Sequence, residues 1–204
     1  MITHIYVAKL KPGVDDATVV AWMDAIRGLQ FDGMIDLRCG SDLGLREGNY
    51  DIGITADFDN AEAWHRYNDD TGHNQIRAEY AKPIVAAQRR IQFLRNRHFE
   101  APGDVRNVTL VDFKPGSPSD QGTKAAQRLL ELRCRGMHHI DSGIDLGLQG
   151  GNATLGVICD FESPEAYAVY DADQLHNVIR ADDIKPFAET IRRVQFELDV
   201  DAKP

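Results

Sequence analysis

The strongest constraint on this chain is an internal repeat, because its second half restates its first at a fixed offset. Lys11-Pro12-Gly13 returns 103 positions later as Lys114-Pro115-Gly116. A gapless comparison of residues 3–95 with residues 106–198 gives identity at about a third of the positions. Chance does not produce a match of this length without gaps, so the sequence is a tandem duplication and two copies of one unit must fold together.

Each copy has the same order of predicted elements. Strands alternate apolar and polar residues, whereas helices carry apolar residues at spacings of three and four. In the first copy the predicted strands are 2–11, 34–45, 50–58 and 89–97, and the predicted helices are 15–30, 60–68 and a stretch from about 72. We expect Pro83 and Pro186 to bend or interrupt that last helix. The order β-α-β-β-α-β is that of ferredoxin-like domains, an α+β fold.

The repeat also predicts how the copies associate. The first should span 1–97 and the second 106–204, with 98–105 as a linker marked by Pro102-Gly103. A ferredoxin-like unit covers only one sheet face with helices, so we expect the two sheets to pack face to face as an intrachain dimeric α/β barrel. The apolar run 155–159 fits a strand buried on both sides. A pocket is expected between each sheet and its helices.

Composition narrows the choice of partner. The chain has 23 Lys and Arg against 32 Asp and Glu, a net charge of −9. Nucleic acids and anionic membrane surfaces both require a basic surface, so neither is an expected partner. The three cysteines have no metal-site spacing, and the N-terminus opens directly into a strand-like run. We therefore expect a cytoplasmic protein with no metal site.

One constellation that occurs in both copies could support acid–base chemistry. Tyr67, His73 and Arg77 return as Tyr170, His176 and Arg180. A histidine can take a proton near neutral pH, a phenol can donate to a carbonyl oxygen, and a guanidinium can hold a carboxylate. The same residues also fit a structural interpretation, in which the histidine caps a helix and the arginine is a solvated surface charge.

Other residues have simpler interpretations. Trp64 lies on an apolar helix face, which favours the core, although it is retained as a candidate substrate contact. Arg89-Arg90, repeated as Arg192-Arg193, enters the last predicted strand. One arginine of each pair should point outward, and the other could reach a carboxylate such as Asp57 or Asp160.

These features together resemble the stress-responsive α/β-barrel (Dabb) family, within the dimeric α/β-barrel superfamily. The resemblance covers nearly all of both copies. It rests on His4, Lys11-Pro12-Gly13, Asp57-Phe58, Glu62-Ala63 and the Tyr-x5-His segment before Lys82-Pro83.

The resemblance implies a function for the repeated histidine and tyrosine. A plant polyketide cyclase of this family performs an aldol condensation with such a pair and no cofactor, and the pair falls on His73 and Tyr67. His4 matches a further pocket histidine, whose counterpart in the second copy is Asn107. Where the family commonly has His-Pro, this chain has Asp70-Thr71. The carboxylate of Asp70 could raise the pKa of His73 or cap the helix.

The sequence therefore predicts a small-molecule enzyme that needs no cofactor and abstracts a proton next to a carbonyl, as a cyclase, isomerase or lyase. The ligand should carry a carbonyl or aromatic group. The predicted bases are His73 and His176, the predicted acids are Tyr67 and Tyr170, and the predicted substrate contacts are His4, Arg77, Arg180, Asn74, Asn177 and Trp64. Two alternatives stay open, a non-catalytic stress or ligand-binding barrel and a cofactorless monooxygenase. The protein should be a monomeric pseudo-dimer or a homo-oligomer of it.

Overall fold

The computed structural model describes residues 1–95 and 103–198 and has the predicted element order in both halves. The first half contains β1 (Ile2–Leu10), α1 (Asp16–Arg27), β2 (Met34–Ser41), β3 (Ile52–Phe58), α2 (Ala61–Asp69), α3 (Thr71–Ile76), a π-helical segment (Arg77–Ala81), α4 (Lys82–Ile84) and β4 (Val85–Leu94). The second half contains β5 (Val105–Phe113), α5 (Gln121–Leu129), β6 (Met137–Ile144), β7 (Leu155–Phe161), α6 (Pro164–Ala172), α7 (Gln174–Ile179), a π-helical segment (Arg180–Ile184) and β8 (Ala188–Glu197).

The boundary between the halves is described only in part. Residues 98–102 of the predicted linker lie outside the described residues, as do 96–97 at the end of the last predicted strand. At the other end of the linker, Val105 is already the first residue of β5. The last strand of the first half begins earlier than predicted, at Val85, because the chain becomes extended directly after the turn that contains Pro83.

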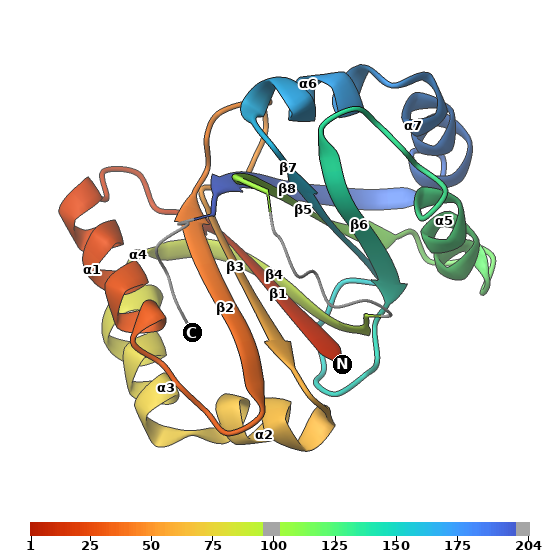
Figure 1. The fold of residues 1–204 in the computed structure, drawn as a ribbon. Helices are drawn as coiled ribbons and strands as arrows, with labels where there is room; N and C mark the ends of the chain where they lie inside the picture. The colour runs from red at the N-terminus through yellow and green to blue at the C-terminus, as the bar shows by residue number, and fades with distance from the viewer. Residues whose placement is uncertain (96–102, 199–204) are drawn as a thin grey trace.

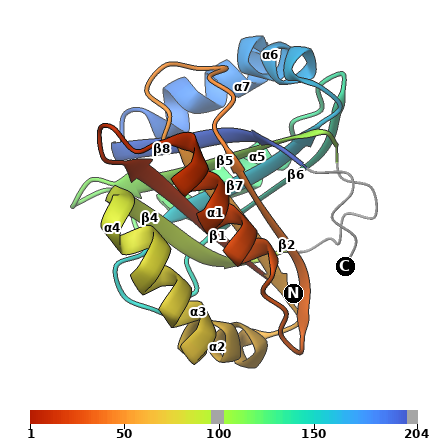
Figure 2. The ribbon, with the colours of Figure 1, turned by 90° about the vertical axis from the view of Figure 1, so that its left-hand side faces the viewer.

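Each half forms one antiparallel four-stranded sheet. The strand orders are β2-β3-β1-β4 and β6-β7-β5-β8, which is the ferredoxin-like order predicted from the repeat. The two sheets face each other, with α1 to α4 outside one and α5 to α7 outside the other (Figures 1 and 2). The predicted fold is therefore confirmed, and β7 is buried along its whole length as its apolar sequence indicated.

The two sheets are joined by an apolar core from both halves. Its buried members are Ile5, Val7, Ile91, Phe93, Val108, Leu110, Ala153, Ile158, Val194, Phe196 and Leu198. The Phe196 ring lies over Gly40 and Gly53, where an added Cβ would come within 2.9 Å and 2.7 Å of it. The close approach of the sheets thus requires glycine at these positions of β2 and β3. Gly143 and Gly156 receive Phe93 in the same way.

The barrel is closed by the segments that follow β2 and β6, which cross to the opposite half. Backbone N–H groups of Leu43 and Tyr50 donate to the Gln195 and Arg193 carbonyls at 2.7 and 2.8 Å. The side chain of Asn49 donates to Gln195 Oε1 at 2.6 Å. The repeated Asp-Leu-Gly-Leu motif that begins at Asp42 is therefore more than a turn, because its segment fastens one half to the other.

The arginine pairs at 89–90 and 192–193 do not bind the aspartates that were predicted as their partners. Arg89 and Arg192, one from each half, both bind Asp112. Asp57 and Asp160 are instead held by Arg95 at 2.6 Å and by Arg106 at 2.7 Å. This difference arises because the sheets bring arginines from neighbouring strand ends onto those two aspartates. Arg90 and Arg193 are consequently left to face the layer between sheet and helices.

The contact between Phe196 and the β3 glycine makes a stability prediction. Gly53→Ala should lower the free energy of unfolding by roughly 1–3 kcal/mol, because the new methyl group would overlap the Phe196 ring in a closely packed core. Gly150→Ala is the matched control, since an added Cβ there meets no atom within 4 Å. Urea unfolding monitored by circular dichroism measures both. Equal stability of the two variants would contradict this account of sheet packing.

Candidate functional site

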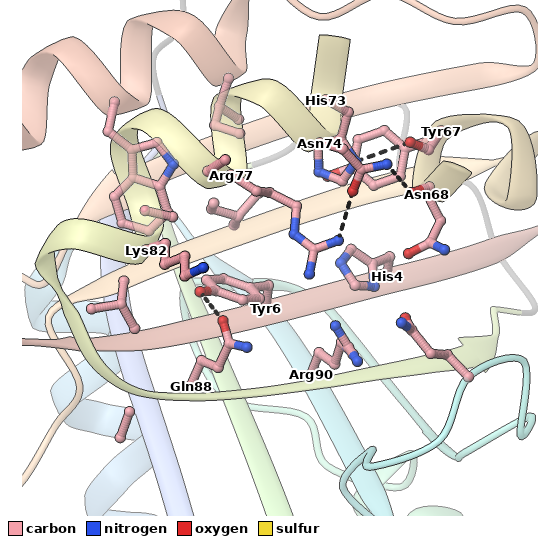
Figure 3. Close-up of a pocket in the computed structure, with 18 of the residues that line it drawn as sticks. His4, Tyr6, Tyr67, Asn68, His73, Asn74, Arg77, Lys82, Gln88 and Arg90 are labelled. Carbon is pink, nitrogen blue, oxygen red and sulfur yellow. Dashed lines mark hydrogen bonds between the residues drawn. The ribbon is translucent and has the colours of Figure 1, made fainter. Parts of the chain in front are cut away.

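The first half contains a cavity of about 610 Å³ between its sheet and its helices. Its walls come from β1, α1, the α2–α3 junction, the π-helical segment and β4, and Gln149 reaches it from the second half. Figure 3 shows the polar side chains that point into it. The volume is within the range of ordinary small-molecule sites, roughly 300–1,000 Å³.

The chain positions the functional side chains through a helix break and a widened turn. Asp70 ends α2 and caps α3, where its Oδ1 accepts from the backbone N–H of His73 at 2.8 Å. The helix then widens into the π-helical segment just before Pro83, which has no N–H to donate to the preceding turn. The predicted interruption at this proline is confirmed. His73 and Arg77 lie one turn apart, and both line the cavity.

The contacts of His73 leave one ring nitrogen free to act as a base. Its Nδ1 lies 2.9 Å from the backbone carbonyl oxygen of Tyr67. A carbonyl can only accept, so Nδ1 carries the proton and Nε2 keeps its lone pair. Burial, followed by the positive charge of Arg77, lowers the pKa of His73 to about 4. Asp70 raises this pKa, as predicted, but burial and Arg77 outweigh it, and Asp70 also caps the helix.

The ring of Tyr67 stacks on His73 with centroids 4.0 Å apart and an interplanar angle of 25°. Tyr67 is buried and lines the cavity beside His73. Burial raises the pKa of its phenol above the ordinary value, so the hydroxyl is protonated at neutral pH. The two residues predicted as an acid–base pair thus lie in contact in one cavity.

His4 has the opposite tautomer, which is fixed by Gln92 of the same half and Asn152 of the other half. Asn152 Nδ2 donates to Gln92 Oε1 at 2.8 Å, so the Gln92 amide nitrogen is turned toward His4 Nδ1 at 2.7 Å. An amide N–H₂ only donates, and therefore His4 Nδ1 accepts and Nε2 carries the proton. Burial, then Arg90 and His73, lower the pKa of His4 to about 3, which keeps the ring neutral.

The cavity wall contains cationic residues as well as aromatic and aliphatic ones. Arg77, Lys82 and Arg90 supply the cations, while Trp22, Ile26 and Ile54 are among the apolar residues. The Tyr6 hydroxyl donates to Gln88 Oε1 at 2.6 Å, and burial raises the pKa of Tyr6 to about 12. Sequence reasoning did not assign Tyr6, Lys82 or Arg90 to the site. The alternation of β1, which places Tyr6 on the same sheet face as His4, is the signal that could have found Tyr6.

The equivalent space in the second half is nearly filled. Its cavity measures about 50 Å³, which leaves room for ordered water but not for an organic substrate. Ile184 and Ile191 take the places of Ala81 and Gln88, and their larger side chains occupy the space. Arg46, from the first half, also reaches this cavity and forms an ion pair with Asp171 there.

The repeated histidine keeps the same contacts in this closed space. His176 Nδ1 lies 3.0 Å from the Tyr170 carbonyl oxygen, and the two rings stack at 4.0 Å. His73 and His176 are equally buried, each with 6% of its surface exposed. The predicted bases therefore share a structural environment, but only His73 faces a cavity of substrate size. The catalytic roles of His176 and Tyr170 and the substrate contact of Arg180 stay predictions, and their cavity has no room for an organic substrate.

Two further predicted contacts lie outside the cavities. Trp64 is 1% exposed and packs in the core with Phe58 and Tyr67, so its predicted contact with substrate is not supported. Asn177 does not line the second cavity, and its side chain instead donates to the Asp171 and Asp173 carbonyls. Asn74 does line the first cavity, where its Oδ1 accepts from Arg77 Nη1 at 3.1 Å.

In the described part of the chain, no group of three or more His, Cys, Asp or Glu side chains is placed to hold a metal ion. Among the same residues, no helix is long and apolar enough to cross a membrane.

Fold and site together define a class of protein: a ferredoxin-like α/β barrel that is dimeric in architecture but made of one chain, with one open histidine–tyrosine cavity. The sequence matches the Stress responsive A/B Barrel Domain family (Dabb) over residues 2–93 and again over 105–198. The chain therefore belongs to the Dabb family as a tandem member. No curated protein sequence matches it.

Solved structures share the architecture. An anthrone oxidase-like protein is 11% identical, with a TM-score of 0.67 over 97% of this chain and 90% of its own. A candidate monooxygenase from Fusobacterium nucleatum subsp. nucleatum is 12% identical, with a TM-score of 0.62 over 97% and 91%. A Dabb family protein from Mesorhizobium loti is 21% identical, with a TM-score of 0.41 over 47% and 97%. At these identities the similarity of the first two structures shows the fold alone.

The buried neutral histidines predict a pH dependence of stability. The folded-state pKa is about 3 for His4 and about 4 for His73 and His176, below the ordinary value of 6.5. The unfolded chain therefore binds protons that the folded chain does not. We expect the free energy of unfolding to fall as the pH drops from 6.5 toward 4, by up to about 1.4 kcal/mol per pH unit for each histidine.

Denaturant unfolding at a series of pH values between 7 and 4 measures this dependence. The double variant His73→Gln/His176→Gln should show a shallower dependence than the wild-type protein, because two of the three groups no longer titrate. An unchanged slope would show that these imidazoles are not held neutral by the fold.

Proposed function

We propose that the first cavity is the active site of an enzyme that performs acid–base chemistry next to a carbonyl group of a small molecule. One observation carries the proposal. Two neutral imidazoles open into the same cavity with opposite tautomers, so that His73 offers a lone pair and His4 offers an N–H. Paired groups of this kind can accept a proton at one point of a substrate while stabilising negative charge at another.

The step begins with the substrate carbon next to the carbonyl lying against His73. Nε2 takes the proton from this carbon, and the electron pair of the broken C–H bond forms an enolate whose charge lies on the carbonyl oxygen. His4 Nε2–H and the Tyr67 hydroxyl are the neutral donors available to that oxygen, and Arg77 supplies positive charge nearby. In a cyclisation the enolate carbon then attacks a second carbonyl, and the oxygen of that carbonyl takes the proton back from His73. In an isomerisation the enolate takes that proton at another carbon.

The halves of the protein play unequal parts in this proposal. The second half positions the first site, because Asn152 orients Gln92 and Gln92 orients His4. It also contributes Gln149 to the cavity wall. The proposed reaction needs no cofactor, since both proton transfer and charge stabilisation come from side chains of this chain.

A structural role of the histidines is a second candidate, supported by a specific observation. His73 and His176 hold the carbonyl of the stacked tyrosine in the same way in both halves, although only one half has an open cavity. In that case the barrel binds a ligand without turning it over. In a further alternative the protein is a monooxygenase. The aromatic side chains of Tyr6, Trp22 and Tyr67 line the cavity and suit the binding of an oxidisable phenol.

The near-identical environments of His73 and His176 provide a matched experiment. In ²H₂O the wild-type protein should catalyse exchange of hydrogen next to the carbonyl in a panel of aryl ketones and 3-oxo acids, followed by NMR. His73→Ala should lower the exchange rate by about 100-fold or more, the size of effect expected for a general base. His176→Ala should exchange at the wild-type rate, because its cavity admits no substrate.

Thermal unfolding of both variants is the control, and we expect similar losses of stability because the two histidines make the same contacts. Equal loss of exchange in the two variants would contradict the catalytic proposal and favour the structural role. Oxygen uptake with candidate phenols, measured with an oxygen electrode, distinguishes the monooxygenase alternative.

A further inference from the structure

The charged side chains that line the first cavity are all positive, although the protein has a net charge of −9. Three cations, Arg77, Lys82 and Arg90, line it, and none of the described residues that line it is an aspartate or a glutamate. The protein partner of the Arg77 guanidinium is the neutral Asn74, and that of Arg90 is the neutral Asn152, at 3.3 Å from Nε. Partly buried guanidinium groups are normally matched by carboxylates.

In the second half, the arginine equivalent to Arg77 binds a carboxylate of the protein itself. Arg180 is the repeat equivalent of Arg77, and its Nη1 lies 3.3 Å from the carboxylate of Asp171. Arg46 reaches the same carboxylate from the opposite half. At the equivalent positions of the first cavity stand the uncharged Asn68 and Gln149. The duplication thus contains one site with its own carboxylate and one site without.

We infer that the substrate of the first cavity carries a carboxylate, which Arg77 binds in the place that Asp171 fills for Arg180 in the second half, with Arg90 as a second cation of the same cavity. The ligand class is an aromatic or unsaturated carboxylic acid, because the rest of the cavity wall includes Trp22, Ile26 and Ile54. Arginine suits this task because its planar fork can donate two parallel N–H bonds to one carboxylate. The inference rests on the first cavity being the site of the proposed function and specifies its substrate.

A bound carboxylate would also strengthen the base. The positive charge of Arg77 contributes to lowering the pKa of His73, second to burial. A negative charge placed on Arg77 opposes that contribution, so the pKa of His73 rises toward its ordinary value when the ligand binds. His73 would then be a stronger base with an anionic substrate in place than in the free cavity.

Isothermal titration calorimetry on the full chain at low ionic strength tests the inference. The probes are benzoate, salicylate and 2-naphthoate, each compared with its methyl ester. We expect at least one acid to bind in the millimolar range or tighter and its ester to bind roughly tenfold more weakly, as expected for loss of a charge-assisted hydrogen bond. Arg77→Gln and Arg90→Gln should each weaken binding of the acid by about the same factor and leave the ester unchanged.

Arg180→Gln is the matched control and should bind the acid as the wild-type protein does, because Arg180 lies in the closed cavity beside Asp171. Circular dichroism at the assay temperature establishes that each variant is folded. Equal binding of acid and ester, no binding of any acid in the millimolar range, or equal losses in Arg77→Gln and Arg180→Gln would overturn the inference.

Different results would contradict the proposed function and the carboxylate inference. If acids bind in an Arg77-dependent way but no hydrogen exchange occurs, the carboxylate inference is supported and the catalytic role of His73 is contradicted. If neutral ketones exchange hydrogen and acids bind no better than their esters, the catalytic proposal is supported and the carboxylate inference is contradicted.

Discussion

The structure depends on the burial of two sheet faces against each other. A single βαββαβ unit would expose the face that carries Ile5, Val7, Ile91 and Phe93, and here the second unit covers it. The contact is close because phenylalanines of one sheet pack over glycines of the other, as Phe196 does over Gly53. Joining both units in one chain keeps the two faces at a high effective concentration, so the barrel forms without a second molecule.

This interface also positions the site. The strand that carries Phe93 carries Gln92 beside it, and the same segment of the second half that closes the barrel supplies Asn152. Sheet packing, barrel closure and the tautomer of His4 are therefore linked through neighbouring residues. A substitution that loosened the interface would be expected to disturb the proton donor in the cavity as well as stability.

Duplication has left two halves with one backbone and two different interiors. His176 and Tyr170 keep the contacts of His73 and Tyr67, yet the space before them is filled by larger aliphatic side chains and the Arg46–Asp171 ion pair. The contact of the histidine with the tyrosine carbonyl is therefore common to both halves and does not depend on an open cavity. The capacity for chemistry is a separate property, which requires the open cavity of the first half.

The sequence by itself determined the fold and the pairing of the halves, because hydrophobic periodicity and a gapless repeat are local and cumulative signals. It also brought together Tyr67, His73 and Arg77, which one helix break and one helical turn place side by side. It could not determine which cavity is open, since that depends on how much space Ile184 and Ile191 fill once the helices are packed. Nor could it place Arg90 in the same cavity as Arg77 or fix the tautomer of His4. Those arrangements join strands and halves far apart in the chain, and only tertiary packing decides such distances.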